Sequence, residues 1–521
     1  MTHLRSCLAA FAGGALGVFG FAPFHFWPAA LASFIVLFAL WLRPSRKRGA
    51  FAIGFFWGLG LFLAGVSWIY VSLNVYGNMP AVLAGIATFC FCAYIALFPA
   101  LGGVAFQWIR QRRHEAATGA TAFDLLLAMP ACFVASEMLR GWFLSGFPWL
   151  TMGYSQTPGG VLPAPLAGFA PLLGVFGISW LMALIAALGV LSVPRVSPVQ
   201  LSRRGMQVAI AAMTGLCALG AALQHAPWSA PAGPTIPASL LQGNIEQSLK
   251  WREDQRVPTL TNYLELAEQS SAKLVVMPET ALPTFLDAVP QDYLEHLRAH
   301  AAARGADLII GAPIAERDAK APAAPHRYFN SAISLGASSS RRYDKSHLVA
   351  FGEFTPPLFA WVYRWLQIPL ADFTEGTTQP QPMNVAGTKI AVNICYEDAF
   401  GAEIARQLPE ANLLVNISNM AWYGQSLAAD QHAQMAQMRA METSRWMLRA
   451  TNTGVTAAID HAGHIVKQMP QFSRGALHVN AEPRTGTTPY AMWRDGPVLI
   501  GLMIVLFACA IPALHKKGKV Q

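Results

Sequence analysis

The segment KIAVNICYEDAF, residues 389–400, decides how the polar part of this 521-residue chain is expected to fold. Residues 389–395 form a short, mostly apolar run of the kind that is typical of a buried strand. Cys395 ends this strand and opens a turn toward a predicted helix at 401–408. Such a turn presents the sulfur at the rim of a sheet and offers backbone N–H groups, such as that of Tyr396, to an oxyanion.

Two more predicted strands are followed by an ionisable side chain. Glu279 comes directly after the apolar run KLVVM at 273–277, and Lys345 lies in the segment YDKSHL just after a further predicted strand. Because strand ends converge in layered sheets, we expect both side chains to lie near Cys395. A partly desolvated carboxylate is a usable general base, and a nearby ammonium group favours the thiolate form of a cysteine. The three residues together predict a cysteine nucleophile with its own base.

Short apolar runs alternate with helical patterns from residue 225 to residue 495, which indicates an α/β layered fold. Cys395 is the single cysteine of this part, so the part cannot form an internal disulfide. The predicted strands are 237–242, 273–277, 307–311, 328–335, 389–395, 411–417 and 455–460, and the predicted helices are 256–271, 291–304, 401–408 and 427–447.

The rest of the chain has the composition of a membrane protein. Hydrophobic residues make up 54% of the chain and charged residues only 12%, which is about half the share usual in soluble domains. A membrane-spanning helix needs about 20 mostly apolar residues. We therefore expect eight spans, at 6–24 and 26–42, two within 50–109 divided by a polar break at 72–80, and then at roughly 122–143, 165–193, 206–224 and 496–514.

The positions of the basic residues predict the orientation of these spans. Lys and Arg cluster at alternate ends of the spans, whereas the opposite short loops carry only Arg140. Because cytoplasmic loops carry the excess of basic residues, both termini are expected in the cytoplasm. The same clustering argues against nucleic-acid binding, despite a net charge of +9. The expected domains are a seven-helix membrane domain at 1–224, an extracytoplasmic catalytic domain at 225–495, and a last span with a basic tail at 496–521.

One ionisable pair is expected within the membrane domain. Glu137 and Arg140 are three residues apart near the outer end of the fifth predicted span. At a helix centre each would cost roughly 2.5–3.5 kcal/mol, so we expect them to pair or to reach toward the interface, with a functional role as the alternative. The segment GFPWLTMGYSQ, residues 146–156, is uncharged and aromatic, as in an interfacial aromatic belt.

The set Glu279, Lys345 and Cys395 resembles the Glu-Lys-Cys triad of the carbon–nitrogen hydrolase, or nitrilase, superfamily. This resemblance implies an α-β-β-α sandwich for the polar domain. Such a domain flanked by eight spans is similar to the membrane-bound branch of the superfamily that acylates bacterial lipoproteins. Met420 departs from the pattern SNxAW of that branch, in which Asp is more frequent, and this leaves the triad intact. The segments that carry the similarity are LQGNIEQSLKW (241–251), MPETALP (277–283), YDKSHLVAFGE (343–353), NICYEDAF (393–400) and the stretch 416–457.

The resemblance also implies the reaction. Cys395 would attack the sn-1 ester of a phospholipid, expected to be phosphatidylethanolamine, while Glu279 takes the thiol proton and Lys345 stabilises the oxyanion. The thioester would then pass its acyl chain to the α-amine of a diacylglyceryl-cysteine at the N-terminus of an apolipoprotein, in a ping-pong cycle. No cofactor, metal or nucleic acid is implied. The protein is expected to be a monomer in the bacterial inner membrane, with its catalytic domain on the periplasmic side.

Four supporting residues match positions that the family links to activity, namely Trp251, Glu353, Tyr396 and Glu397. Glu353 follows Lys345 by eight residues, and Tyr396 and Glu397 stand beside the expected nucleophile. The alternative for the two glutamates is that they only orient Lys345. For Trp251 the alternative is structural packing.

The stretch FTPPLFAWVYRWLQIPLADF, residues 354–373, is unusually apolar for a loop of a soluble domain. Leu358, Trp361 and Trp365 recur in it at helical spacing. This pattern predicts an amphipathic lid that contacts the outer leaflet and admits acyl chains to Cys395. The alternative is a helix that packs on the sheet.

Two other functions fit parts of the sequence. A membrane-anchored amidase or nitrilase acting on a small molecule would have the same triad, but a single anchor would serve it. A transporter with an additional domain would need charged residues along its spans, and the first four predicted spans have none. A metal site is not indicated, because His461 and His464 flank a predicted hairpin turn and the chain has no HExxH or CxxC motif.

Overall fold

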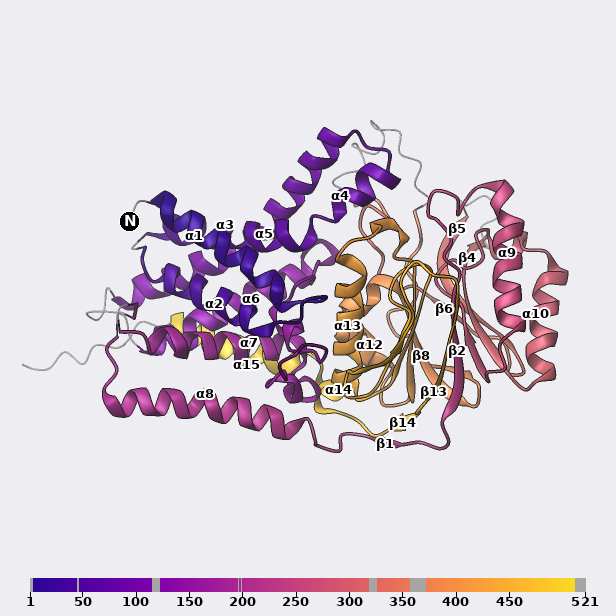
Figure 1. Cartoon of the computed structure of the whole chain (residues 1–521). Helices are drawn as coiled ribbons and strands as arrows, with labels where there is room; N and C mark the ends of the chain where they lie inside the picture. Colours follow the sequence, from indigo (N-terminus) through magenta and orange to yellow (C-terminus); the bar gives the residue numbers. More distant parts are fainter. Residues whose placement is uncertain are drawn as a thin grey trace, which may run out of the picture. The chain divides into compact units, whose positions relative to one another are not determined.

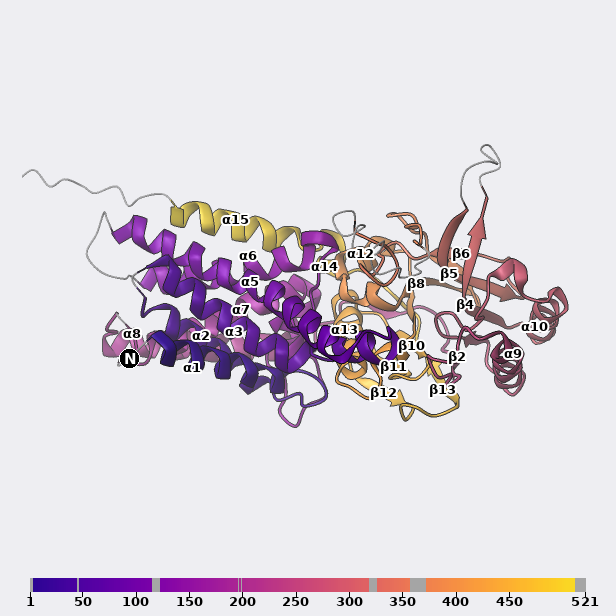
Figure 2. The same ribbon diagram turned by 90° about the horizontal axis from the view of Figure 1, so that it is seen from above.

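The computed structural model describes residues 3–44, 46–114, 122–194, 196–197, 199–317, 326–356 and 372–510. The chain divides into two compact units, one of residues 1–226 with 493–521 and one of residues 227–492. The first unit is helical, whereas the second contains the β-sheets (Figures 1 and 2).

Apolar helices build the first unit, because a helix satisfies the backbone hydrogen bonds of an apolar segment within that segment, without water. Five helical segments in the described part are long and apolar enough to cross a membrane: Lys47–Val66, Ala81–Arg113, Asp124–Ser145, Ala167–Leu191 and Arg203–Leu223. A described helix lies in each of the eight segments predicted to span. The helices are α1 (His3–Leu16), α2 (Trp27–Trp41), α3 (Lys47–Val66), α4 (Ile69–Val71), α5 (Ala81–His114), α6 (Met129–Trp142), α7 (Ala170–Leu191), α8 (Arg203–Leu223) and α15 (Gly496–Ala510).

The ion pair predicted in this unit is present and buried. Arg140 Nη2 lies 3.9 Å from Glu137 Oε1, and both side chains are 3% exposed. Arg140 also donates to the carbonyl oxygen of Trp149 at 2.6 Å, and Glu137 Oε1 accepts from the backbone N–H of Met152 at 2.8 Å. Residues 148–157 are buried, so this stretch packs within the unit and does not form the interfacial aromatic belt that its composition suggests. Through these hydrogen bonds, the Glu137–Arg140 pair holds the segment 148–157 against α6.

Two six-stranded sheets form the second unit. The first has the strand order β13-β2-β3-β4-β5-β6 and the second has the order β12-β11-β10-β9-β8-β7. Strands β2, β3 and β4 run parallel, as do β8, β9 and β10. The strands of the first sheet are β13 (Gly475–Ala481), β2 (Ile236–Gln242), β3 (Leu274–Val276), β4 (Asp307–Glu316), β5 (Arg327–Gly336) and β6 (Arg342–Asp344). Those of the second are β12 (Ile465–Gln468), β11 (Ala457–Ile459), β10 (Met447–Thr451), β9 (Leu413–Ser418), β8 (Thr388–Ile394) and β7 (Met383–Val385).

The main core of this unit lies between the two sheets. It joins Leu240, Val276 and Ile309 of the first sheet to Val392, Val415 and Leu448 of the second, all of them almost fully buried. Burying one such side chain stabilises the fold by roughly 1.5–3 kcal/mol. Helices α9 (Glu253–Glu268) and α10 (Gln291–Ala303) lie beside the first sheet, and α12 (Gly401–Ile404) and α13 (Ala428–Thr443) lie beside the second (Figure 1). The unit is therefore layered α/β, with its parallel strands ending at one rim.

The sequence pattern predicts the central strands but not all element ends. The predicted strand 389–395 stops at Ile394, and Cys395 belongs to the following turn. The predicted helix 427–447 is too long, because Ser444 has a left-handed backbone with φ +51° and ends α13 at Thr443. Strand β10 begins at Met447, the last residue of that predicted helix. Four other strands of the two sheets, β6, β7, β12 and β13, lie outside the predicted ranges, although a strand before Lys345 was expected. Strand β4 continues to Glu316, beyond its predicted end at residue 311.

Candidate active site

Glu279 lies in the turn directly after β3, and its carboxylate is fixed by hydrogen bonds. The side chain is only 6% exposed. Oε1 accepts from Asn330 Nδ2 at 2.8 Å, and Oε2 accepts from the backbone N–H of Asn419 at 2.8 Å. The next residue, Thr280, has φ +50°, so the turn is tight. The carboxylate is therefore held in one orientation at the rim of the first sheet.

Lys345 follows β6 and reaches into the same place. It is 1% exposed, and Nζ donates to Glu353 Oε1 at 2.9 Å and lies 3.6 Å from Glu279 Oε1. Burial lowers the pKa of Lys345, but the carboxylates of Glu353 and Glu279 outweigh burial and hold the pKa above the usual lysine value. Lys345 is therefore a permanent cation between two carboxylates.

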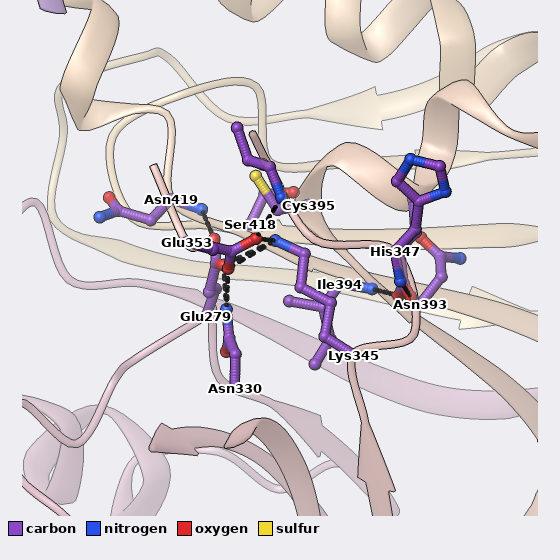
Figure 3. Close-up of polar contacts among 12 residues, drawn as sticks. Glu279, Asn330, Lys345, His347, Glu353, Asn393, Ile394, Cys395, Ser418 and Asn419 are labelled. Atoms are coloured by element: carbon purple, nitrogen blue, oxygen red, sulfur yellow. Dashed lines mark hydrogen bonds and ion pairs between the residues drawn. The ribbon is translucent and has the colours of Figure 1, made fainter. Parts of the chain in front are cut away.

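Cys395 is the first residue of the 3₁₀ turn η9 (Cys395–Ala399), directly after β8. Its backbone is left-handed, with φ +53°, which is uncommon for a residue with a side chain. Figure 3 shows the sulfur pointing toward the region of the Glu279 carboxylate and the Lys345 ammonium group. The structure thus brings together the three residues that the strand ends predict.

The electrostatics of this cluster favour the thiol form of Cys395 at rest. Burial, followed by the charge of Glu279, raises the pKa of the thiol to about 12, although Lys345 opposes this shift. At neutral pH the thiolate is therefore a very minor form. A nucleophilic attack by Cys395 consequently needs a base that removes the proton as the sulfur reacts. Glu279 is the carboxylate whose orientation suits that task.

Glu353 and Glu397 make different contacts. Glu353 binds Lys345 directly, with Nζ 2.8 Å from Oε2. Glu397 is buried, and its carboxylate accepts from the backbone N–H of Ile394 at 2.6 Å and of Ser346 at 2.7 Å. It therefore ties the backbone just before the cysteine to the backbone just after the lysine. Burial raises the pKa of Glu397, and the backbone donors oppose that shift.

The other predicted residues are less enclosed. Tyr396 is half-buried, and its ring packs edge-on against Phe400 with centroids 5.2 Å apart. Trp251 is 54% exposed, so it does not have the buried packing role considered for it.

The residues of the predicted lid, Leu358, Trp361 and Trp365, lie outside the described residues. Their role stays a prediction: truncating both tryptophans is expected to slow phospholipid turnover without lowering the melting temperature.

A buried polar network beneath Cys395 was not predicted. Arg449 on β10 donates through Nη1 to Asp398 at 2.5 Å and through Nη2 to His432 Nδ1 at 2.7 Å. Because Nδ1 accepts this hydrogen bond, Nε2 carries the proton and donates to the carbonyl oxygen of Cys395 at 2.9 Å. Burial and the charge of Arg449 lower the pKa of His432 well below its usual value, so the ring is neutral. Through the hydrogen bond from His432, this network holds the backbone of Cys395 in its left-handed conformation.

Replacing His432 by alanine is expected to slow acylation of Cys395 about 5- to 10-fold, because one buried hydrogen bond contributes about 1–1.5 kcal/mol. His432→Gln keeps an N–H donor and an oxygen acceptor and should recover most of the rate. The initial rate of acyl-enzyme formation, measured by intact mass, checks both variants. A wild-type rate in His432→Ala would show that the hydrogen bond to the cysteine carbonyl does not matter.

Met420 replaces a polar residue of the family pattern and is buried beside this network. It is 2% exposed, and its Sδ lies 3.0 Å from His432 Nδ1. A Cβ on Gly454 would lie 2.9 Å from the Met420 Cβ, so the position is tightly packed. The thioether therefore fills space next to a neutral imidazole.

Within the described ranges, no group of three or more His, Cys, Asp or Glu side chains could hold a metal ion.

Comparisons with known proteins agree with the division into two units. Residues 13–188 match the family model of the apolipoprotein N-acyltransferase N-terminal domain, and residues 238–490 match the carbon-nitrogen hydrolase model. The fold and the cluster at its rim thus belong to a membrane-attached carbon-nitrogen hydrolase domain. An amidase structure from Nesterenkonia sp. is 16% identical, with a TM-score of 0.36 over 52% of this chain and 97% of that chain.

Two relatives extend over the whole chain. The apolipoprotein N-acyltransferase of Nitrosomonas europaea is 44% identical over 98% of both chains. That of Methylococcus capsulatus is 42% identical over 97% of this chain and 96% of the relative. The chain belongs to the apolipoprotein N-acyltransferase family. It is therefore an acyltransferase of a bacterial membrane whose acceptor is a lipoprotein.

Proposed function

We propose that the acyl donor is a phospholipid, expected to be phosphatidylethanolamine acylated at sn-1, and that the acyl chain passes through a thioester on Cys395. Glu279 removes the thiol proton as the sulfur attacks the ester carbonyl. The Lys345 ammonium group and the backbone N–H of Tyr396 stabilise the oxyanion of the tetrahedral intermediate. The C–O bond then breaks, Glu279 returns the proton to the leaving oxygen, and a lysophospholipid departs.

The second half of the cycle uses the same groups. The neutral α-amine of a diacylglyceryl-cysteine attacks the thioester carbonyl, and the proton that it loses goes to Glu279. The C–S bond breaks, and the thiol of Cys395 recovers that proton. Because an amide is less reactive than a thioester, the second step runs downhill. The cycle is ping-pong and involves no cofactor.

The observation that carries this proposal is the cluster of buried Glu279 and Lys345 with the partly buried Cys395, in a chain that also contains apolar helices. Lys345 Nζ lies within 3.6 Å of Glu279, and the carboxylate is oriented by two further donors. Such a cluster in a water-soluble setting would act on small molecules. Apolar helices in the same chain support a substrate from the bilayer, where lipid esters are plentiful.

We further propose eight membrane spans, cytoplasmic termini and a periplasmic catalytic domain at 225–495, in the inner membrane and as a monomer. The alternation of basic loops supports this orientation. The membrane domain is 1–224, and 496–521 supplies the last span and tail. Cysteine labelling with a membrane-impermeant reagent in whole cells tests the orientation, because a cysteine introduced near residue 326 should react only if that loop faces outward.

The reaction is tested with detergent-purified protein, phosphatidylethanolamine and a synthetic diacylglyceryl-cysteine peptide. Lysophospholipid and N-acylated peptide should appear in equal amounts, and Cys395→Ala should produce neither. Lysophospholipid without acylated peptide would indicate a lipase instead.

A small-amide hydrolase is the second candidate, because a cysteine with a glutamate base also cleaves amides. Ammonia release from simple aliphatic amides, with phospholipid left intact, would favour it.

A further inference from the structure

We propose that Lys250 is a further positioning residue of the active site, whose ammonium group holds the backbone of Glu279 and supplies a second positive charge beside Cys395. The sequence pattern drew attention only to its neighbour Trp251, since a lysine in a polar loop is usually solvated. The inference rests on the roles proposed for Glu279, Lys345 and Cys395, and it adds a residue to them.

Lys250 is buried and bonded, not solvated. It is 3% exposed, and its Nζ donates to the carbonyl oxygen of Glu279 at 3.2 Å. The turn that carries Glu279 is also confined from β4, where a Cβ on Gly311 would lie 2.7 Å from the Glu279 Cα. The backbone of the base is therefore held by close packing and by the lysine. A buried ammonium group costs several kcal/mol unless it is paired, so its presence needs a reason.

The segment that carries this lysine is anchored to the loops around the site. Asn452 donates through Nδ2 to the carbonyl oxygen of Ile245 at 2.7 Å and accepts from the Ile245 N–H at 2.9 Å. Asn419 donates through Nδ2 to Gln247 Oε1 at 2.8 Å, and its backbone N–H is the donor to Glu279 Oε2. The loop that contains Asn419 thus fixes both the segment that carries Lys250 and the carboxylate of Glu279.

The charges in the cluster explain why a second cation is useful. Lys345 is a single positive charge between the carboxylates of Glu279 and Glu353. Both carboxylates raise the pKa of the Cys395 thiol, after burial as the largest cause. A charged Lys250 balances the second carboxylate, so that two lysines face two glutamates. It also attracts the anionic forms of Glu279 and Cys395. It therefore favours formation of the thiolate.

The charge of Lys250 depends on pH in an accessible range. Burial lowers the pKa of Lys250 to about 8, although Glu279 and Cys395 oppose this shift. Among the described residues, Glu279 in the turn after β3 and Cys395 in η9 are the titratable groups whose charges act most on this ammonium group. Lys250 is thus charged below pH 8 and becomes neutral above it. Its support for the thiolate should disappear over the same range.

The test measures alkylation of Cys395 by iodoacetamide, using the full-length protein in detergent and reading the modified peptide by mass. Lys250→Met should be alkylated about tenfold more slowly than wild type at pH 7, which corresponds to a thiol pKa change of about one unit. The ratio of wild-type to variant rates should fall toward one between pH 7 and pH 9.5. Lys250→Arg, which keeps its charge, should react like wild type at pH 7 and stay about tenfold faster than Lys250→Met up to pH 9.5.

Lys273→Met is the matched control, because this exposed lysine also donates to backbone carbonyls, those of Arg304 at 3.0 Å and Gly305 at 3.3 Å. It should react like wild type at every pH. An alkylation ratio of one for Lys250→Met at pH 7, or a constant ratio up to pH 9.5, would overturn the inference. Alkylation needs no lipid, so it decides the role of Lys250 even if phosphatidylethanolamine gives no acyl-enzyme, a result that would overturn the proposed donor instead.

Discussion

Replacing Glu279 by glutamine is expected to slow acyl-enzyme formation by about 10²–10⁴-fold, the usual contribution of a positioned general base. Glutamine has nearly the same shape and can still accept one hydrogen bond from Asn330 or Asn419. It cannot take the proton of the Cys395 thiol, whose pKa burial still raises. The initial rate of mass increase at Cys395 in the presence of phosphatidylethanolamine measures the effect.

The pH dependence of the same variant separates loss of the base from general damage. Without Glu279 the reaction needs preformed thiolate, whose fraction rises about tenfold per pH unit below the thiol pKa. The ratio of wild-type to Glu279→Gln rates should therefore fall as the pH rises from 6 to 8. Glu268→Gln is a suitable control, because this carboxylate is exposed and pairs with His296 at 2.7 Å, away from the active site. A pH-independent ratio for Glu279→Gln would contradict the assigned role.

Replacing Lys345 by methionine is expected to abolish measurable acyl transfer and to destabilise the fold by about 3–5 kcal/mol. The lysine is 1% exposed and lies 2.8 Å from Glu353 and 3.6 Å from Glu279, so its removal leaves two buried carboxylates without their cation. Loss of one charged oxyanion partner alone costs about 10²–10³-fold in rate. Thermal unfolding and acyl-enzyme formation should be measured on the same preparation.

The double variant Lys345→Met/Glu353→Gln separates these two effects. Removing one carboxylate should restore part of the lost stability but none of the activity, because the oxyanion still lacks its cation. Lys389→Met serves as the surface control, since its ion pair with Glu410 is about half exposed and is worth about 0–1 kcal/mol. Recovery of activity in the double variant would show that Lys345 acts only by neutralising Glu353.

The three central residues were predictable because each follows an apolar strand, and parallel strand ends meet at one rim. Glu279 after β3 and Cys395 after β8 are the clearest cases, and the strands are recognisable from short runs of buried side chains. Lys345 follows β6, a strand of three residues that was expected before the lysine but without defined bounds. Its position was inferred from the resemblance to a known triad as much as from periodicity.

The network below the cysteine could not be predicted, because its members look ordinary in the sequence. Arg449 interrupts the apolar run of β10, and His432 lies on a helix rich in Gln and Met. Only the tertiary fold shows that α13 turns His432 toward the Cys395 carbonyl and that Arg449 is fully buried beneath it. Lys250 is a similar case, since burial of a loop lysine depends on contacts with segments more than 25 residues away.

The central claim is that Cys395 carries the acyl chain as a thioester, and intact-mass analysis tests it most directly. Detergent-purified protein is incubated with phosphatidylethanolamine in the absence of a lipoprotein acceptor, beside Cys395→Ala. We expect one fatty-acyl adduct on the wild-type protein that neutral hydroxylamine removes, and none on the variant. An adduct that resists hydroxylamine or persists in Cys395→Ala, or unconsumed lipid without any adduct, would contradict the account.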